Sequence, residues 1–133
     1  MSKIINESGK RKKAVARATL REGTGIIRIN SRLLDTMEPE VMKMKIMEPL
    51  ILADEVAKKI DANITVRGGG AMSQTDAVRL ALAKAIVAYT GSKTIKNAFL
   101  EYDRHMLVAD VRRNEPHKPN DSKPRAARQK SYR

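Results

Sequence analysis

Two clusters of basic side chains, one near each end of the chain, are the main candidates for a binding site in this sequence. Residues 1–21 hold seven Lys or Arg and one acid, and residues 111–133 hold eight and two, so each segment has a net charge of +6. The residues between them hold twelve bases and twelve acids. Charge concentrated in this way favours a polyanionic partner, and nucleic acid is the most common one.

The first cluster contains the run Lys10-Arg11-Lys12-Lys13 and, a little further on, Arg17. Taken alone, such a run is as often solvated surface as it is a binding site. A second basic segment at the far end of the chain favours the binding interpretation. We therefore expect all five side chains to contact RNA.

The second cluster lies in residues 111–133, which contain three prolines. Prolines among so many charges exclude a hydrophobic core, so the sequence predicts an extended tail. Guanidinium groups spaced along such a tail suit RNA, because each can bind a phosphate with two donors or stack on a base. The candidate RNA-binding residues of the tail are Arg112, Arg113, His117, Lys118, Lys123, Arg125 and Arg128.

A third candidate is the run Gly68-Gly69-Gly70, which follows Arg67 and precedes a predicted helix. Backbone N–H groups at a helix N-terminus favour anions, so Arg67, Gly69 and Gly70 together could hold an RNA phosphate. The alternative is a tight turn between a strand and a helix, without any ligand. The sequence leaves both possibilities open.

Other kinds of chemistry find little support in the residue types. The chain has no Cys, and its two histidines are twelve residues apart, so neither thiol chemistry nor a metal site is expected. No Walker loop and no nucleophile elbow is present. With no long apolar stretch and no signal peptide, we expect a cytoplasmic protein without membrane contact, cofactor or small-molecule substrate.

Alternating apolar residues predict the strands that must position these groups. Residues 12–21 place Ala14, Ala16, Ala18 and Leu20 on one face, and residues 60–67 alternate in the same way. Residues 22–25 have turn composition, and residues 26–30 are predicted to return beside 12–21 as a hairpin. A last short strand is expected over 106–111.

The first predicted helix covers residues 40–52. Its periodicity indicates Val41, Met44 and Met47 as the buried residues, since methionine must fill a core in which aromatic residues are scarce. Pro49 is expected to kink or break it.

Two further helices follow the triple glycine. Ser73 and Asp76 resemble a capping box that opens a long helix, and Gly91 is placed to end it. Another helix is expected over 93–102, with Phe99 and Tyr102 inward. The sum is an α+β fold of about four strands with helices packed on the sheet. A globular domain over 1–110, with a basic N-terminal segment, precedes the tail over 111–133.

These residues also resemble a known family. The run from Gly9 to Arg17, the Gly23-Thr24-Gly25 turn before Ile29-Asn30, and Val66 to Gly70 before an Ala-rich helix are similar to universal small-subunit ribosomal protein nine. The last five residues, Gln-Lys-Ser-Tyr-Arg, resemble its archaeal and eukaryotic branch, and residues 115–120 favour the archaeal one. The resemblance covers the chain from about residue 6 to 133.

The resemblance implies an α+β domain similar to the second domain of small-subunit ribosomal protein five. It implies a place in the head of the small subunit, on rRNA and beside neighbouring ribosomal proteins, with the tail reaching peptidyl-site tRNA. The basic residues named above are then rRNA-binding. The family pattern matches Arg133 and Ser131 as tRNA contacts, and it is followed less closely at Lys130 and Tyr132, where the bacterial branch usually has an aromatic residue and a lysine.

Two alternatives remain open at this point. A free nucleic-acid-binding protein, such as an RNA chaperone, would show the same charge. A phosphotransfer enzyme could use the triple-glycine turn, although it would need a nucleotide loop and a metal-binding carboxylate that the sequence does not offer.

Overall fold

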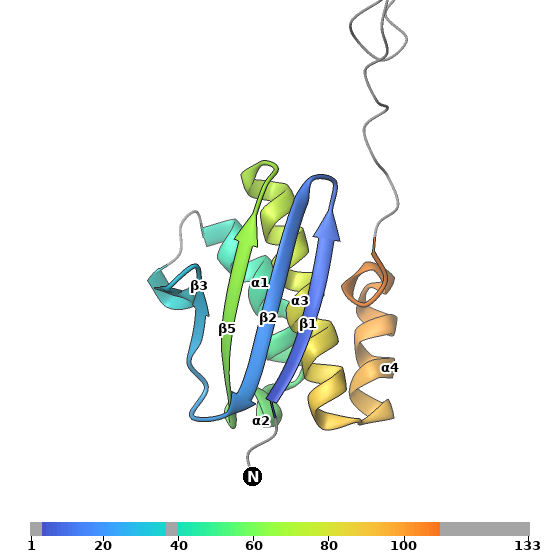
Figure 1. Ribbon diagram of the computed structural model, residues 1–133. Helices are drawn as coiled ribbons and strands as arrows, with labels where there is room; N and C mark the ends of the chain where they lie inside the picture. The colour runs from blue at the N-terminus through green and yellow to red at the C-terminus, as the bar shows by residue number, and fades with distance from the viewer. Residues whose placement is uncertain (1–3, 37–39, 110–133) are drawn as a thin grey trace, which may run out of the picture.

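Five strands form one mixed sheet in the computed structural model of the chain, which describes residues 4–36 and 40–109 (Figure 1). The strand order is β1-β2-β5-β3-β4. Neighbouring strands are antiparallel except for β3 and β5, which are parallel. The strands are β1 Ile4–Arg11, β2 Ala14–Glu22, β3 Ile27–Ile29, β4 Arg32–Leu33 and β5 Ile60–Arg67.

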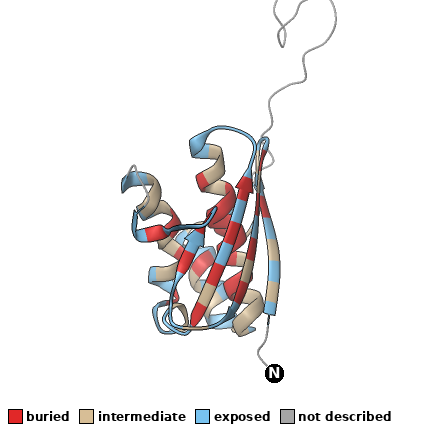
Figure 2. Cartoon of the chain, turned by 60° about the vertical axis from the view of Figure 1, so that its left-hand side comes forward, coloured by how far each residue is buried: buried red, intermediate tan, exposed pale blue. Residues whose placement is uncertain are grey.

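The helices form a layer on one face of this sheet (Figures 1 and 2). They are α1 Glu40–Leu52, α2 Asp54–Ala57, α3 Ala71–Thr90 and α4 Lys93–Tyr102, with 3-10 turns at Leu34–Thr36 and Arg104–Met106. The central helix α3 packs on β1, β2 and β5, and α1 and α4 pack on α3. Within the described ranges, no helix has the length and apolar character needed to cross a membrane.

The core lies between the sheet and α3. The even-numbered residues of β2 and β5 face the helices and are buried, from Ala14 to Leu20 and from Ile60 to Val66. Because three of the β2 residues are alanines, α3 can approach the sheet closely. At Gly9 of β1 the approach is closer still, since a Cβ there would lie 2.5 Å from the Ala77 carbonyl oxygen.

Several sequence-based predictions are confirmed. The fold is α+β, the helices over 40–52 and 93–102 have the predicted bounds, and 60–67 is a strand. Gly91 ends α3 in the left-handed conformation, and its N–H donates to the Val87 carbonyl. Phe99 is fully buried, but Tyr102 is 55% exposed and the prediction that it faces inward is wrong.

The predicted hairpin between residues 12–21 and 26–30 is wrong, because β2 pairs with β1 and β5 instead. The strand β3 lies on the far side of β5 and runs parallel to it. Asn30 fixes this placement, since its side chain accepts from the Val66 N–H and donates to the Val66 carbonyl. Two strands were not predicted, β1 and the two-residue β4, and the pattern of β1 mixes polar and apolar residues as edge strands do.

Two predictions about helices are also wrong. Val41 and Met44 of α1 are 71% and 61% exposed, whereas Met47 packs against the core as predicted, beside the buried Ile46 and Pro49. The helix continues past Pro49, whose ring packs in the interior. The buried face of α1 is therefore rotated about the helix axis relative to the predicted one.

The beginning of α3 and the end of the described chain differ from the predictions as well. The N-cap of α3 is Gly70, three residues before the proposed cap Ser73, and no side chain caps the helix. Met106 ends the 3-10 turn Arg104–Met106, and residues 107–109 are not in a strand. The rest of the predicted strand, 110–111, lies outside the described residues.

The loop between β2 and β3 is held by Asp61 of β5. Its Oδ1 accepts from the N–H groups of Thr24 and Ile26, each at 3.0 Å. These hydrogen bonds, with that of Ile26 the stronger influence, hold the pKa of the Asp61 carboxyl below its usual value. A carboxyl with a lowered folded-state pKa stabilises the protein above its unfolded pKa of about 4, and the contribution is lost as the pH falls through the folded value.

We therefore expect Asp61→Asn to lower the free energy of unfolding by about 1 kcal/mol at pH 7, because a charge-assisted hydrogen bond becomes a neutral one. The difference from the wild type should shrink below about pH 4, where Asp61 itself becomes protonated. Urea denaturation at pH 7 and at a pH below about 4 measures this difference in the free energy of unfolding. Asp54→Asn is the control, because the Asp54 carboxylate is exposed. A difference that stays constant with pH would contradict the role given to the charge.

Candidate nucleic-acid interface

The first basic run and the triple glycine lie together at one end of the sheet. The turn between β1 and β2 carries Lys12 and Lys13, and the turn between β5 and α3 carries Gly68 to Gly70 (Figure 1, upper end of the sheet). A Cβ at Gly68 would lie 2.5 Å from the Lys13 carbonyl oxygen. The two motifs are therefore in contact, although they are more than fifty residues apart in the sequence.

Backbone conformation explains why glycine is needed in this contact. Gly68 and Gly69 have φ values of +81° and +68°, which side chains strongly disfavour. A Cβ at Gly69 would also lie 3.1 Å from the Ala14 nitrogen. We call this surface, made of Lys10, Lys12, Lys13, Arg67 and Gly68–Gly70, the basic end.

The side chains of the basic end point to solvent. Lys10, Lys12, Lys13 and Arg67 are exposed. Lys10 and Arg67 both lie opposite Val15, one on each side of it, so their side chains share the outer face of the sheet. Two cations at the turn and one on each of β1 and β5 make a local positive surface that an anion can reach.

The triple glycine forms the tight turn that one interpretation predicted. The Gln74 side chain donates to the Gly68 carbonyl and helps to close it. Gly70 has room around it, since a Cβ there would meet nothing within 4 Å. The first N–H groups of α3 follow directly, so the turn and a phosphate site are compatible with one another.

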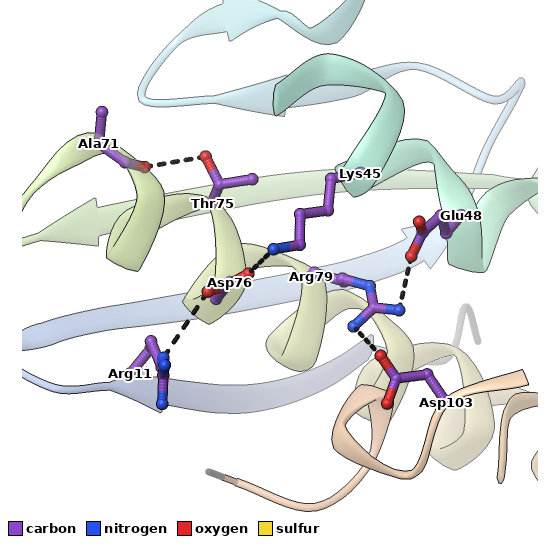
Figure 3. A network of polar contacts seen from close by, with 8 residues as sticks. All are labelled: Arg11, Lys45, Glu48, Ala71, Thr75, Asp76, Arg79 and Asp103. Atoms are coloured by element: carbon purple, nitrogen blue, oxygen red, sulfur yellow. Dashed lines mark hydrogen bonds and ion pairs between the residues drawn. The ribbon is translucent and has the colours of Figure 1, made fainter. Parts of the chain in front are cut away.

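Arg11 differs from its neighbours in the basic run because it faces the helices. Its guanidinium lies 3.7 Å from the Asp76 carboxylate of α3, and its side chain is only 15% exposed. Asp76 also pairs with Lys45 of α1 at 2.6 Å (Figure 3). In place of the predicted capping box, Asp76 thus joins β1, α1 and α3.

A second ion-pair group was not foreseen from the sequence. Arg79 of α3 is 7% exposed and contacts Glu48 of α1 at 2.5 Å and Asp103, after α4, at 3.1 Å (Figure 3). Burial raises the pKa of Asp103, but the His105 N–H and the Arg79 guanidinium lower it by more, so its pKa lies below the usual value. The one signal in the sequence is a single arginine within the apolar part of α3.

These two groups border a hollow of about 190 Å³ between the helices and β1. Four Lys or Arg side chains line it, and three of them, Arg11, Lys45 and Arg79, face the carboxylates of Asp76 and Asp103. We therefore assign it a structural role, in joining α1 and α3 to the end of α4. Among residues 4–36 and 40–109, no three His, Asp or Glu side chains gather as metal ligands would.

Arg17 lies in the middle of β2 on the outer face of the sheet and is exposed. It is separate from the basic end but on the same side. The remaining predicted site residues lie outside the described part of the chain. They are Arg112, Arg113, His117, Lys118, Lys123, Arg125, Arg128, Lys130, Ser131, Tyr132 and Arg133.

Comparison with known proteins gives a consistent result. The family model described as Ribosomal protein S9/S16 matches residues 9–133. The small ribosomal subunit protein uS9 of Methanococcus maripaludis strain C7 is 57% identical over 133 residues, covering 98% of this chain and 99% of that protein. The uS9 protein of Methanococcus vannielii is 56% identical with the same coverage.

Proposed function

The chain belongs to the ribosomal protein S9/S16 family, and on that premise we propose that it binds small-subunit rRNA and contacts peptidyl-site tRNA through its C-terminal tail. Membership makes it a structural constituent of the small ribosomal subunit and not an enzyme, as predicted. It also confirms the archaeal resemblance and the predicted location on the ribosome.

The observation that best supports rRNA binding is the contact between the basic turn and the glycine turn. Four exposed cations surround a stretch of backbone that has no side chains of its own. RNA is bound mainly through phosphates, and close approach of the RNA backbone requires such an open surface. In the proposal, Lys10, Lys12 and Lys13 bind rRNA together with Arg67, Gly69 and Gly70.

The proposal divides the work between the two ends of the chain. The basic end and Arg17, with Arg11 close behind them, hold the globular domain on rRNA. The tail, with its net charge of +6, holds rRNA along its length, and residues 130–133 contact the tRNA. Neighbouring proteins of the subunit head complete the environment of the domain.

The salt dependence of rRNA binding tests this division. With about six to eight phosphates neutralised by the tail, the plot of log K against log salt should fall with a slope of about −4 to −7. Removing residues 114–133 should flatten the slope markedly, because six bases are lost. Filter binding of an rRNA fragment from the subunit head measures both.

The matched control is Lys93→Gln with Lys96→Gln, which removes two exposed charges from α4, away from the basic end. It should leave the slope within about one unit of the wild type. An unchanged slope after removal of the tail would show that the globular domain carries the binding.

A further inference from the structure

Among the described residues, no helix packs on one face of the sheet, and α3 covers the other face (Figure 2). The odd-numbered residues of β2 and β5 alternate with the buried ones and so lie on the uncovered side. We call the uncovered surface the open face. The residues that strand register places on it are Ile4, Asn6, Ser8 and Lys10 of β1, Val15, Arg17, Thr19 and Arg21 of β2, Asp61, Asn63, Thr65 and Arg67 of β5, Arg28 of β3 and Leu33 of β4.

Strand register arranges these residues in rows across the sheet. Ser8, Arg17 and Thr65 form one row, and Asn6, Thr19, Asn63 and Arg28 form the next. Directly opposite residues have Cβ atoms about 5 Å apart, so each row is a continuous polar strip. Around Arg17 the strips enclose a shallow hollow of about 460 Å³.

The cations of the open face differ from those on the helix side. Within the part of the chain that the structure describes, Lys10, Arg17, Arg28 and Arg67 form no ion pair, whereas Lys45 and Arg79 on the helix side each contact a carboxylate. Among the described residues, strand register places one carboxylate on this face, that of Asp61, which accepts from the Thr24 and Ile26 N–H groups. The cations outnumber it, so the open face is positive.

We propose that the open face binds double-helical rRNA, through phosphates at its cations and through ribose 2′-hydroxyls at its Ser, Thr and Asn side chains. This rests on the proposed rRNA binding and extends it to Arg28, Ser8, Thr19, Asn63 and Thr65. Duplex RNA is recognised by its shape, with phosphate and 2′-hydroxyl contacts across its wide, shallow minor groove. A broad polar sheet with separated cations fits that surface.

The residue types of the open face exclude the other common mode. Single-stranded RNA is bound on sheets by stacking bases on aromatic side chains. The aromatic residues of the described chain, Tyr89, Phe99 and Tyr102, all lie in α3 and α4. A protein partner would require an apolar centre, but the large apolar residues of this face are dispersed, with Ile4 and Leu33 on the two edge strands and Val15 on β2.

The test measures the affinity of the full-length protein for three probes of one sequence. They are an RNA duplex of about twenty base pairs, its single strand, and the DNA duplex. The variant Arg17→Gln with Arg28→Gln should weaken RNA-duplex binding by about tenfold and reduce the salt slope by one to two. The charge-matched control Lys93→Gln with Lys96→Gln should change binding by less than about threefold.

A second variant tests the proposed contacts with the ribose 2′-hydroxyls. Thr65→Val keeps the shape and the strand preference of the side chain and removes its hydroxyl group. It should reduce the preference for the RNA duplex over the DNA duplex by about threefold without changing the salt slope. A preference for the single strand in the wild type would overturn the proposal.

Cross-linking shows whether the same face meets rRNA in the subunit. Because the chain has no cysteine, Thr65→Cys provides one site for a thiol-linked photo-cross-linker, with Lys96→Cys as the control on α4. Thr65→Cys should cross-link to paired rRNA in assembled subunits. Cross-links to protein, or none, would refute the open-face proposal, whereas failure of the wild type to enter subunits would refute the proposed function itself.

Discussion

Replacing Gly9 by alanine is expected to lower the free energy of unfolding by about 2–4 kcal/mol. The added Cβ would lie 2.5 Å from the Ala77 carbonyl oxygen and 2.7 Å from the Ala81 nitrogen. Both atoms belong to the backbone of α3, so no side-chain rotation can relieve the overlap. Helix α3 and β1 must separate, and the core between them loosens.

Urea denaturation followed by circular dichroism measures this loss. Gly70→Ala is the matched control, because its Cβ would meet nothing within 4 Å and its φ of −93° suits any residue. The control should stay within about 0.5 kcal/mol of the wild type. Equal stability of the two variants would show that α3 does not pack on β1 as closely as described.

Deleting Arg133 is expected to weaken tRNA binding to the peptidyl site by several-fold to about a hundredfold. Its guanidinium offers paired planar donors for a phosphate, and one such contact is worth about 1.5–3 kcal/mol before the cost of ordering the tail. The 23 residues of 111–133 could span about 75–80 Å when extended, so a distant ligand is within reach.

Filter binding of tRNA to small subunits that contain either protein checks this expectation. Arg133→Lys is the matched variant, since it keeps the charge and loses the paired donors. We expect it to bind with intermediate affinity and both variants to assemble normally. Equal tRNA affinity for all three would remove Arg133 from the tRNA contact, and loss of the protein from mature subunits would assign this residue to assembly.

Local signals predicted the elements of this fold better than they predicted the arrangement of those elements. Alternation gave the bounds of β5, and periodicity with Gly91 gave the end of α3. The hairpin partner of β2 was wrong because hydrogen bonds from Asn30 to Val66, 36 residues away, decide where β3 lies. Such long-range pairing cannot be recognised from the pattern of neighbouring residues in the sequence.

The candidate site shows the same limit. Composition and spacing identified the basic run and the triple glycine, but their contact through Lys13 and Gly68 depends on the β1–β2–β5 order. Strand parity then separates Arg11, which pairs with Asp76, from Lys10 on the open face. Arg28 was missed because β3 is only three residues long, too short for its alternation to show which side faces solvent.

The central claim, that this protein is a component of the small ribosomal subunit held by rRNA, is tested most directly by its position in a sucrose gradient. A cell lysate containing the tagged protein is treated with DNase and separated at low magnesium concentration, so that the subunits dissociate. We predict that the protein sediments with the small subunit and that RNase releases it. Sedimentation as free protein, or with DNA in the untreated lysate, would contradict the account.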